Sequence, residues 1–417
     1  MKIVQFIRCF LFFWWTILPF LGANNMVWAQ RERAEEWVIQ GDAHIQSLQF
    51  REAIAAYSQA ITLDPEYAEA YFKRATALVQ TGRSGEAIED YNRAYAINPE
   101  IEYLYSRRAR ARMLHQDYKG ALQDLENALE KQPSNETLLS LHAHASEEEG
   151  RLEDAIKDCN KIISNDPGDT LAYLKRALLK AQQKSVEAAL LDIEEARSLC
   201  RSSPVVYHVE GLIYHLAGAY DSALVAYNRA LAIDPDFAMA YFGRGITYRA
   251  LGKTEAAAQD LDTAIELNQK LAYAYYNRAL NQKDLGDNEK AVADYSEAIR
   301  LKSNFAEAYY NRGLAKKKLG DYEGALADVQ KALRINPEDP ELHNTLGNLY
   351  VLFEEYQQAI QSYSRALESD DTYAEAYHNR GLAYLMNFRQ EEGCRDLRRS
   401  AQLGHQPANR RLRHFCE

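Results

Sequence analysis

The chain has 417 residues, with 49 lysines and arginines against 60 aspartates and glutamates, so its formal net charge at pH 7 is −11. This acidic surplus argues against a general affinity for nucleic acid or for anionic lipid. Hydrophobic residues make up 47% of the chain, which is enough to build packed cores, and the length alone would predict two or three globular domains.

Residues 1–29 follow a pattern of their own. Lys2 and Arg8 give a basic beginning, Cys9–Gly22 is an apolar run, and Val27–Ala29 ends on a small residue. This succession predicts a secretory signal peptide that is cleaved before Gln30. The alternative is an uncleaved membrane anchor, although the apolar run is shorter than the roughly 20 residues that span a bilayer. Cleavage would leave 47 basic against 60 acidic side chains, a net charge of about −13.

From Ala34 onward the sequence repeats with a period of 34 residues. The clearest copy, Ala306–Asp339, contains two helical patterns on either side of Leu319–Asp321. The second pattern ends at Asn336, because a residue that precedes a proline is pushed out of the α region. Small and apolar residues at i, i+4 and i+7 predict a packed helical face. One such hairpin cannot bury that face alone, so it needs copies on both sides.

Eleven copies follow one another without a gap over residues 34–407. The twentieth position is alanine in ten copies and Gly393 in the last, and the twenty-seventh is alanine in all but two, which have Ile162 and Ser400. The eighth position is never larger than alanine: Gly41, Ala75, Ala109, Ala143, Ala177, Gly211, Gly245, Ala279, Gly313, Gly347 and Gly381. Small residues at these positions let the two helices of a copy approach closely.

This pattern resembles the tetratricopeptide repeat family, whose 34-residue helix-turn-helix unit has small residues at these positions, an aromatic at the fourth and a terminal proline. The resemblance covers about nine-tenths of the chain. It implies an all-α, right-handed α-solenoid of eleven repeats. Because repeats four and five depart most from the pattern, we divide the array there. The expected order is a lead-in (30–33), repeats one to five (34–203), repeats six to eleven (204–407) and a capping helix (408–417).

The sequence predicts no enzyme. It contains no Gly-rich phosphate loop after a strand and no G-x-S-x-G elbow, and the repeats leave no room for a catalytic domain. His142 and His144 have the composition of a metal site, but residues two apart on a helix point about 200° apart. We therefore expect neither a metal site nor a cofactor.

In the resembled family, the second, fifth, sixth, ninth, twelfth and thirteenth positions of the first helix line a concave groove that binds peptides. At 100° per residue these positions lie opposite the fourth, seventh, eighth and eleventh, which pack inward. Asn277, Asn311 and Asn379 occupy the sixth position, where related proteins use asparagine to bond an extended peptide backbone. The alternative is that each is only a tolerated polar residue beside water.

Repeats six to nine add an aromatic strip and a cationic row on the same face: Phe242, Tyr273, Tyr276 and Tyr310, with Arg249, Lys283 and Lys317. Together they predict a site for a peptide that has apolar side chains and an acidic group or a C-terminal carboxylate. Part of the strip could instead pack between neighbouring first helices, and the row could be a solvated face. No run of three repeats reproduces the family's full carboxylate clamp.

The cysteines divide into two groups. Cys159 and Cys200 are expected to be buried thiols. Cys394 and Cys416 lie equally far from residue 405, inside a predicted turn, so an antiparallel pairing of the last repeat helix with the cap would bring them level. In an oxidising compartment they could form a disulfide.

The sequence therefore predicts an exported, non-enzymatic scaffold that binds partner proteins or extended peptides in its concave groove, in the bacterial periplasm or cell envelope. The alternative is a membrane-tethered structural subunit of an envelope assembly or secretion machine, held by an uncleaved residue 1–29 segment. Other proteins or peptides are the expected partners, nucleic acid is not, and a membrane is expected only if that segment is retained.

Overall fold

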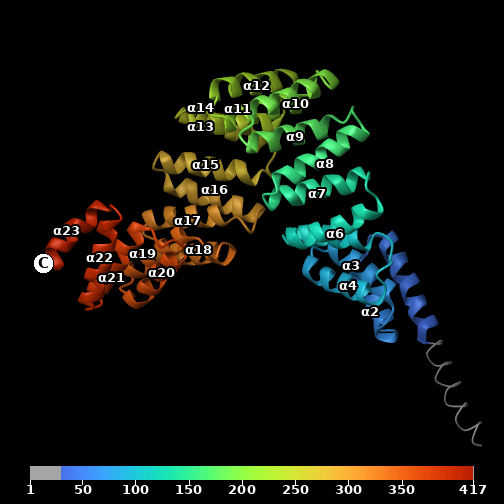
Figure 1. The fold of residues 1–417 in the computed structure, drawn as a ribbon, viewed down its shortest axis with the longest axis horizontal. Coiled ribbons are helices and arrows are strands. Elements are labelled where there is room, and N and C mark those ends of the chain that lie inside the picture. The colour runs from blue at the N-terminus through green and yellow to red at the C-terminus, as the bar shows by residue number, and fades with distance from the viewer. Residues whose placement is uncertain (1–29, 417) are drawn as a thin grey trace, which may run out of the picture. The chain divides into compact units, whose positions relative to one another are not determined.

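The computed structural model describes residues 30–416, and this part of the chain consists of helices joined by short turns (Figure 1). Helices α1 to α22 form eleven consecutive pairs, one for each repeat, and α23 follows the last pair. The described residues contain no strand. This architecture confirms the predicted all-α solenoid of eleven repeats with a final capping helix. The predicted signal peptide at 1–29 lies outside the described residues.

The contacts divide the helices into an N-terminal unit that ends at Leu199 and a C-terminal unit that begins at Cys200. In the N-terminal unit, α1 includes residues 30–46 and is followed by α2 (Phe50–Leu63), α3 (Ala68–Gln80), α4 (Ser84–Ile97), α5 (Leu104–Leu114), α6 (Tyr118–Lys131), α7 (Glu136–Glu148), α8 (Leu152–Asn165), α9 (Thr170–Gln182) and α10 (Val186–Leu199). The expected lead-in at 30–33 is thus helical and belongs to α1.

In the C-terminal unit the helices are α11 (Pro204–Leu216), α12 (Tyr220–Ile233), α13 (Ala238–Ala250), α14 (Thr254–Leu267), α15 (Ala272–Asp284), α16 (Asn288–Leu301), α17 (Ala306–Lys318), α18 (Tyr322–Ile335), α19 (Pro340–Leu352), α20 (Tyr356–Ser369), α21 (Ala374–Met386), α22 (Gln390–Gln402) and α23 (Gln406–Phe415). The last helix begins two residues before the expected start, because Pro407 fits the first turn of a helix, where no N–H is needed.

Every repeat turns between its two helices on a left-handed residue at the fifteenth position. Six of these residues are glycines, from Gly82 to Gly320, and five are not: Leu48, Gln116, Lys184, Glu354 and Phe388. A side chain in this conformation carries a steric cost that glycine avoids. The helix pair is therefore fixed by a backbone conformation that some repeats adopt against the preference of their side chain.

The core lies between the two helices of each repeat. The tyrosines at the twenty-fourth position, Tyr57, Tyr91, Tyr227, Tyr295 and Tyr363, are at most 1% exposed. Alanines at the twentieth and twenty-seventh positions surround them and are almost completely buried. Burial of a tyrosine ring removes a large apolar area from water, so one ring in each of these repeats fills the space that the small residues leave.

An arginine at the seventh position joins the helices of seven repeats. Its guanidinium bonds both oxygens of the aspartate at the twenty-third position, as Arg312 Nε and Nη2 do with Asp328 at 2.8 and 2.6 Å. The pairs are Arg74–Asp90, Arg108–Asp124, Arg176–Asp192, Arg244–Asp260, Arg278–Asp294, Arg312–Asp328 and Arg380–Asp396. A planar fork facing a carboxylate in this way is geometrically demanding. The pairs therefore fix the relative register of the two helices.

The same arginines also link each repeat to its neighbours. Arg312 Nη1 donates to Ser296 Oγ in the preceding repeat at 3.0 Å, and Arg244 Nη1 reaches Asn228 in the same way. Each of the seven guanidinium groups also lies over the fourth-position tyrosine of its own repeat, 5.3–5.9 Å from the ring centroid. This arrangement combines an ion pair with a cation–π contact, and it explains why those tyrosines are only half-buried.

Within each unit, successive first helices contact one another: α3 with α5 and α5 with α7 in the N-terminal unit, and α11, α13, α15 and α17 in order in the C-terminal unit. Helices that touch along one side of a stack lie on its inner side. The fifth, sixth, ninth and twelfth positions of these helices therefore form the inner face of each unit. None of the helices in residues 30–416 is both long enough and apolar enough to cross a bilayer.

Candidate functional site

The predicted inner-face residues of repeats eight and nine bond mainly to one another. Asn311 Nδ2 donates to Tyr276 Oη at 3.2 Å and to Glu307 O at 3.0 Å, while Lys283 Nζ donates to Asn311 Oδ1 at 2.9 Å. Asn277 Nδ2 donates to Tyr273 O, one turn back on its own helix, at 2.8 Å. The Asn311 amide is therefore bonded at both its nitrogen and its oxygen, and a peptide backbone would have to displace those bonds, whereas the Asn277 side-chain oxygen has no bond among the described residues.

The side chains of the predicted aromatic strip also have partners within the array. Tyr310 Oη donates to Glu341 at 2.8 Å, and burial is the main cause of its raised pKa. Tyr276 packs against Phe305 with ring centroids 4.8 Å apart. Phe242 packs on the Leu261 cluster. These three rings pack within the array, Phe242 partly against α14 of its own repeat, so part of the strip is structural.

The remaining residues of the predicted site have mixed surroundings. Tyr273 is 50% exposed and accepts a hydrogen bond from Lys302 at 2.6 Å. Arg249 lies 3.6 Å from Asp284, and Lys317 has no ion-pair partner among the described residues. Asn379, two repeats further on, donates to Asn344 Oδ1 at 3.1 Å. The structure thus brings Tyr276, Lys283 and Asn311 together and leaves Asn379 apart.

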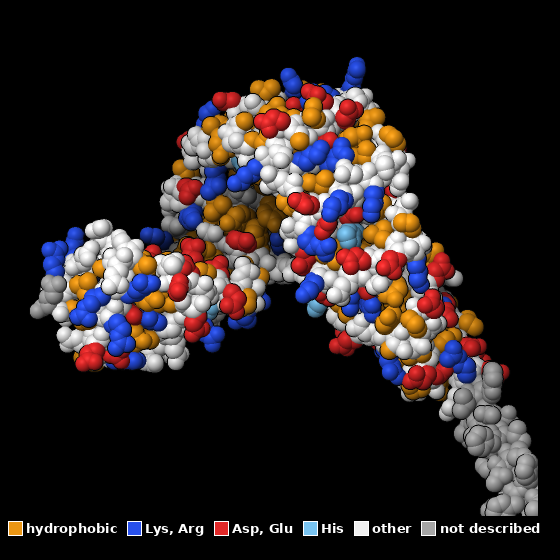
Figure 2. Space-filling model, in the orientation of Figure 1, with side chains coloured by type: hydrophobic (Ala, Val, Ile, Leu, Met, Phe, Trp, Pro, Cys, Tyr) orange, Lys and Arg blue, Asp and Glu red, His pale blue; other side chains and the backbone are white. Residues whose placement is uncertain are grey.

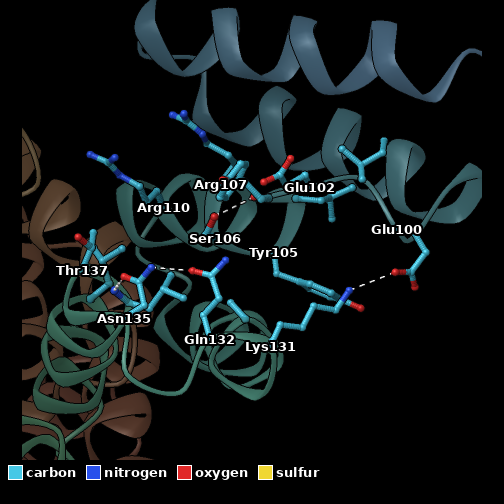
Figure 3. A pocket seen from close by; sticks show the side chains of 16 residues that line it. Glu100, Glu102, Tyr105, Ser106, Arg107, Arg110, Lys131, Gln132, Asn135 and Thr137 are labelled. Carbon is cyan, nitrogen blue, oxygen red and sulfur yellow. Dashed lines mark hydrogen bonds and ion pairs between the residues drawn. The ribbon is translucent and has the colours of Figure 1, made fainter. Parts of the chain in front are cut away.

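The N-terminal unit has two hollows that sequence reasoning missed. One, of about 480 Å³, crosses the inner face from Thr76 and Val79 on α3, over Met113 on α5, to Leu141 and His144 on α7. The other, of about 470 Å³, lies beside it between α5, α6 and α7 (Figure 3). Arg107, Arg110 and Leu141 line both. The two hollows therefore adjoin at these three side chains, and together they form the groove.

Helix α5 carries four arginines of two kinds. Arg108 and Arg112 point inward and bond the buried Asp124, with Arg108 Nη2 at 2.6 Å and Arg112 Nη1 at 2.9 Å. Arg107 and Arg110 are exposed, and neither has an ion-pair or ring partner among the described residues. Figure 3 shows both extending in the same direction from α5, with no bond drawn to either. The groove therefore presents two cationic groups that are not neutralised.

The rest of the groove is partly apolar. Leu114 is 65% exposed at its edge. On its floor the hydroxyls of Thr76 and Tyr91 lie 3.0 Å apart, and burial raises the pKa of Tyr91 although both free arginines oppose that rise. Two carboxylates lie in the groove wall: Glu102, and Glu100, which accepts a bond from Lys131 Nζ at 3.2 Å. The groove thus alternates apolar side chains with two free guanidinium groups.

Arg107 and Arg110 stand at the sixth and ninth positions of repeat three, both of which sequence analysis assigned to the groove. The signal that could have found them is the pairing rule: a seventh-position arginine has an aspartate sixteen residues later, as Arg108 has Asp124. Arg107 and Arg110 are not at the seventh position, so that rule provides no aspartate for them.

The structure joins Cys394 to Cys416 as a disulfide, with Cα atoms 5.7 Å apart. Cys159 is buried, and burial raises the pKa of its thiol to about 11. The expectation of a buried Cys200 was wrong, because this residue follows the last turn of α10 and is exposed.

No group of three or more potential metal ligands occurs within residues 30–416. His142 instead takes the seventh position of repeat four, and its Nδ1 bonds Asp158. It therefore replaces the arginine of the other repeats.

Models of known protein families match most of the repeats. Tetratricopeptide repeat models match residues 40–100, 106–170, 238–271 and 306–339, and a model described as TPR repeat matches 211–249, 283–320 and 354–387. The chain belongs to the tetratricopeptide repeat family. Among curated proteins, no relative matches the sequence significantly.

Two solved structures are similar in fold. The crystal structure of the APC/C hetero-tetramer Cut9–Hcn1 matches with a TM-score of 0.51 and 18% identity, over 92% of this chain and 76% of that one. A tetratricopeptide repeat protein from Parabacteroides merdae matches with a TM-score of 0.50 and 21% identity, over 60% of this chain and 98% of that one. At such identities the likeness concerns the fold alone.

Proposed function

We propose that this chain is an exported, non-enzymatic scaffold that binds extended, acidic segments of partner proteins across the inner face of its N-terminal unit. The observation that carries the proposal is the pair of unpartnered guanidinium groups, Arg107 and Arg110, in a groove that spans α3, α5 and α7.

The chemistry of the groove selects the ligand. A guanidinium fork favours a carboxylate over a neutral group. The apolar side chains of Val79, Met113 and Leu141 favour aliphatic residues between the acids. An extended peptide matches a groove that crosses three parallel first helices, because its alternate side chains can reach successive helices. A peptide of alternating glutamate and leucine is the simplest probe of this chemistry.

The experiment measures fluorescence anisotropy of that labelled peptide with the full chain and with R107Q/R110Q. Each lost contact between a guanidinium and a carboxylate in this half-open groove is worth about 1 kcal/mol, so the double substitution should weaken binding about 30-fold. Added salt should weaken binding to the unchanged chain, because exposed charges are screened.

Two controls make the result specific. The peptide with glutamine in place of glutamate should bind more weakly and without salt dependence. R51Q/K119Q, which removes the same charge from exposed positions on the second helices α2 and α6, should bind like the unchanged chain. Equal loss from both double variants would mean that only net charge matters, and the proposed groove would be wrong.

Export is part of the proposal and is supported by the succession of basic, apolar and small residues in 1–29. The alternative, a membrane-tethered subunit of an envelope assembly, requires that segment to be retained. The intact mass of the protein from envelope extracts separates the two: a chain that begins at Gln30 supports export, whereas the full mass in a detergent-soluble fraction supports the tether.

The inner face of repeats six to nine stays a prediction. Because Asn311 already bonds Tyr276 and Lys283, N277A/N311A should weaken peptide binding there only if a ligand replaces those bonds. Loss with N277A/N311A, and none with R107Q/R110Q, would move the site to the C-terminal unit.

A further inference from the structure

The C-terminal end of the solenoid has a surface of opposite sign to the rest of the chain. Arg395 and Arg398 on α22 and Arg411 on α23 are exposed, and none has an ion-pair partner within residues 30–416. Figure 2 shows Lys and Arg side chains gathered over the end of the chain where α22 and α23 lie in Figure 1. In a protein with a net charge of −11, this local excess of cationic groups is a distinct feature.

An aromatic side chain stands among these arginines. Phe388 is 96% exposed, at the tip of the turn between α21 and α22. It lines one hollow with Arg411 and Phe415 and another with Arg395 and Arg398, whose lining also includes Glu391 and the Arg389–Glu392 ion pair. Phe388 therefore shares a hollow with each of the three arginines and with a second exposed ring.

The backbone makes this exposed ring costly to keep. Phe388 has φ 59° at the turn position where six other repeats have glycine, and a bulky side chain is disfavoured in that conformation. Its ring gains little from packing, because almost all of it is in water. Neither the turn conformation nor packing in the core explains a phenylalanine here. We therefore look for its role in contact with another molecule rather than in stabilising the fold.

We propose that this end surface, formed by Phe388, Phe415, Arg395, Arg398 and Arg411, binds the headgroup region of an anionic lipid bilayer. Aromatic rings at a protruding tip insert at the boundary between headgroups and acyl chains, and arginines around them contact lipid phosphates. The overall negative charge does not prevent this, because charges more than about 10 Å away are screened at moderate salt. The disulfide of Cys416 to Cys394 on α22 holds the end of α23, and with it Phe415, at this surface.

A bilayer fits these observations better than an acidic protein does. A protein partner that buried Phe388 would have to offer a cavity for a side chain that projects on a turn, whereas a bilayer accepts a projecting ring without a matching shape. The surface would give the scaffold a contact with a membrane that does not depend on residues 1–29. It extends the proposed function and does not rest on the peptide groove.

The test is sedimentation of the full chain with vesicles of phosphatidylglycerol and phosphatidylcholine in equal parts, compared with phosphatidylcholine alone. We expect binding to the anionic vesicles only. R395Q/R398Q/R411Q should reduce the partition coefficient about 100-fold, since each arginine near an anionic surface contributes about fivefold. F388G should reduce it about tenfold, because a buried ring is lost.

F388G is a favourable variant because glycine relieves the left-handed backbone, so a loss of binding cannot be attributed to unfolding. The matched control is L48G, which changes the same turn position in repeat one, where Leu48 is 75% exposed with φ 57°. It should bind vesicles as the unchanged chain does. Equal sedimentation of the unchanged chain, F388G and the triple variant would overturn the proposal. Absence of binding to either kind of vesicle would also overturn it.

Discussion

The substitution Asp124→Asn tests whether the arginine–aspartate pairs hold the solenoid together. The Asp124 side chain is 2% exposed and accepts from Arg108 Nε at 2.9 Å, Arg108 Nη2 at 2.6 Å and Arg112 Nη1 at 2.9 Å. Asparagine has nearly the same shape but no charge, and its amide N–H groups would face guanidinium donors. The variant therefore removes the carboxylate that balances Arg108 and the nearer of the two that face Arg112, whose Nε also lies 3.5 Å from Asp117.

The size of the effect follows from burial. Removal of one partner from a fully buried ion pair costs about 3–5 kcal/mol. The Arg108 side chain is 9% exposed, but Arg112 is 16% exposed and also bonds Gly120 O at 2.7 Å. We therefore expect the lower end, a loss of about 3 kcal/mol in the free energy of unfolding. R108M should be strongly coupled to D124N, by about 2 kcal/mol in a double-mutant cycle.

Because a solenoid's stability is a sum over neighbouring repeats, the loss should be local. Hydrogen exchange resolved by helix should show faster exchange in α5 and α6 and little change in the C-terminal unit, alongside a lower urea midpoint. The control is E66Q, since Glu66 and Arg93 pair across repeats while 70% and 46% exposed, which is worth at most about 1 kcal/mol. If D124N lost no more stability than E66Q, the pairs would be incidental contacts and the reasoning would fail.

Two further predictions concern single groups. Burial lowers the pKa of His208 to about 4 from an ordinary value of 6.5. As the pH falls, the unfolded chain therefore binds this proton before the folded chain does. The contribution of His208 to the free energy of unfolding is complete above about pH 6.5, and about 2 kcal/mol of it should be lost by pH 5. H208F should lack this part of the pH dependence in urea unfolding curves recorded at pH 7 and pH 5. If the free energy of unfolding changed equally between the two pH values in both proteins, His208 would not be the cause. For the disulfide, thiol titration of the unfolded, unreduced protein should find Cys159 and Cys200, with Cys9 as well if residues 1–29 are retained, but neither Cys394 nor Cys416. Reduction should lower the stability of the C-terminal unit by about 3 kcal/mol.

The sequence was sufficient for the fold because each repeat encodes the same local geometry. Small residues at three positions and a tyrosine at the twenty-fourth specify how two helices pack, and an ungapped period leaves no other arrangement. The boundaries were less certain, as Gln406 shows, because helix ends depend on one or two residues such as Pro407. The arginine–aspartate pairs could have been found as well, since Arg312 and Asp328 recur at the same two positions in other repeats.

The site was harder, because a helical period says which face a side chain occupies but not what it bonds. Asn311 was placed on the inner face from its position, yet its bonds to Tyr276 and Lys283 come from a neighbouring repeat and depend on rotamers. The same period placed Arg107 beside Arg108, but only coordinates show that one is free and the other paired. Sequence therefore identifies candidate surfaces, whereas the free hydrogen-bonding capacity that a ligand needs appears only in the assembled structure.

The four arginines of α5 divide into two that hold the helix in place and two that face the groove, so substitutions in the two sets should affect stability and binding differently. Arg108 and Arg112 anchor this helix through Asp124, and the anchored helix holds Arg107 and Arg110 at the groove. Loss of the anchor should therefore loosen the binding residues as well, so D124N should weaken peptide binding along with stability. Loss of the exposed arginines removes no buried contact, so R107Q/R110Q should weaken binding while changing the free energy of unfolding by no more than about 0.5 kcal/mol. If both variants reduced stability equally, Arg107 and Arg110 would belong to the core rather than to a binding site.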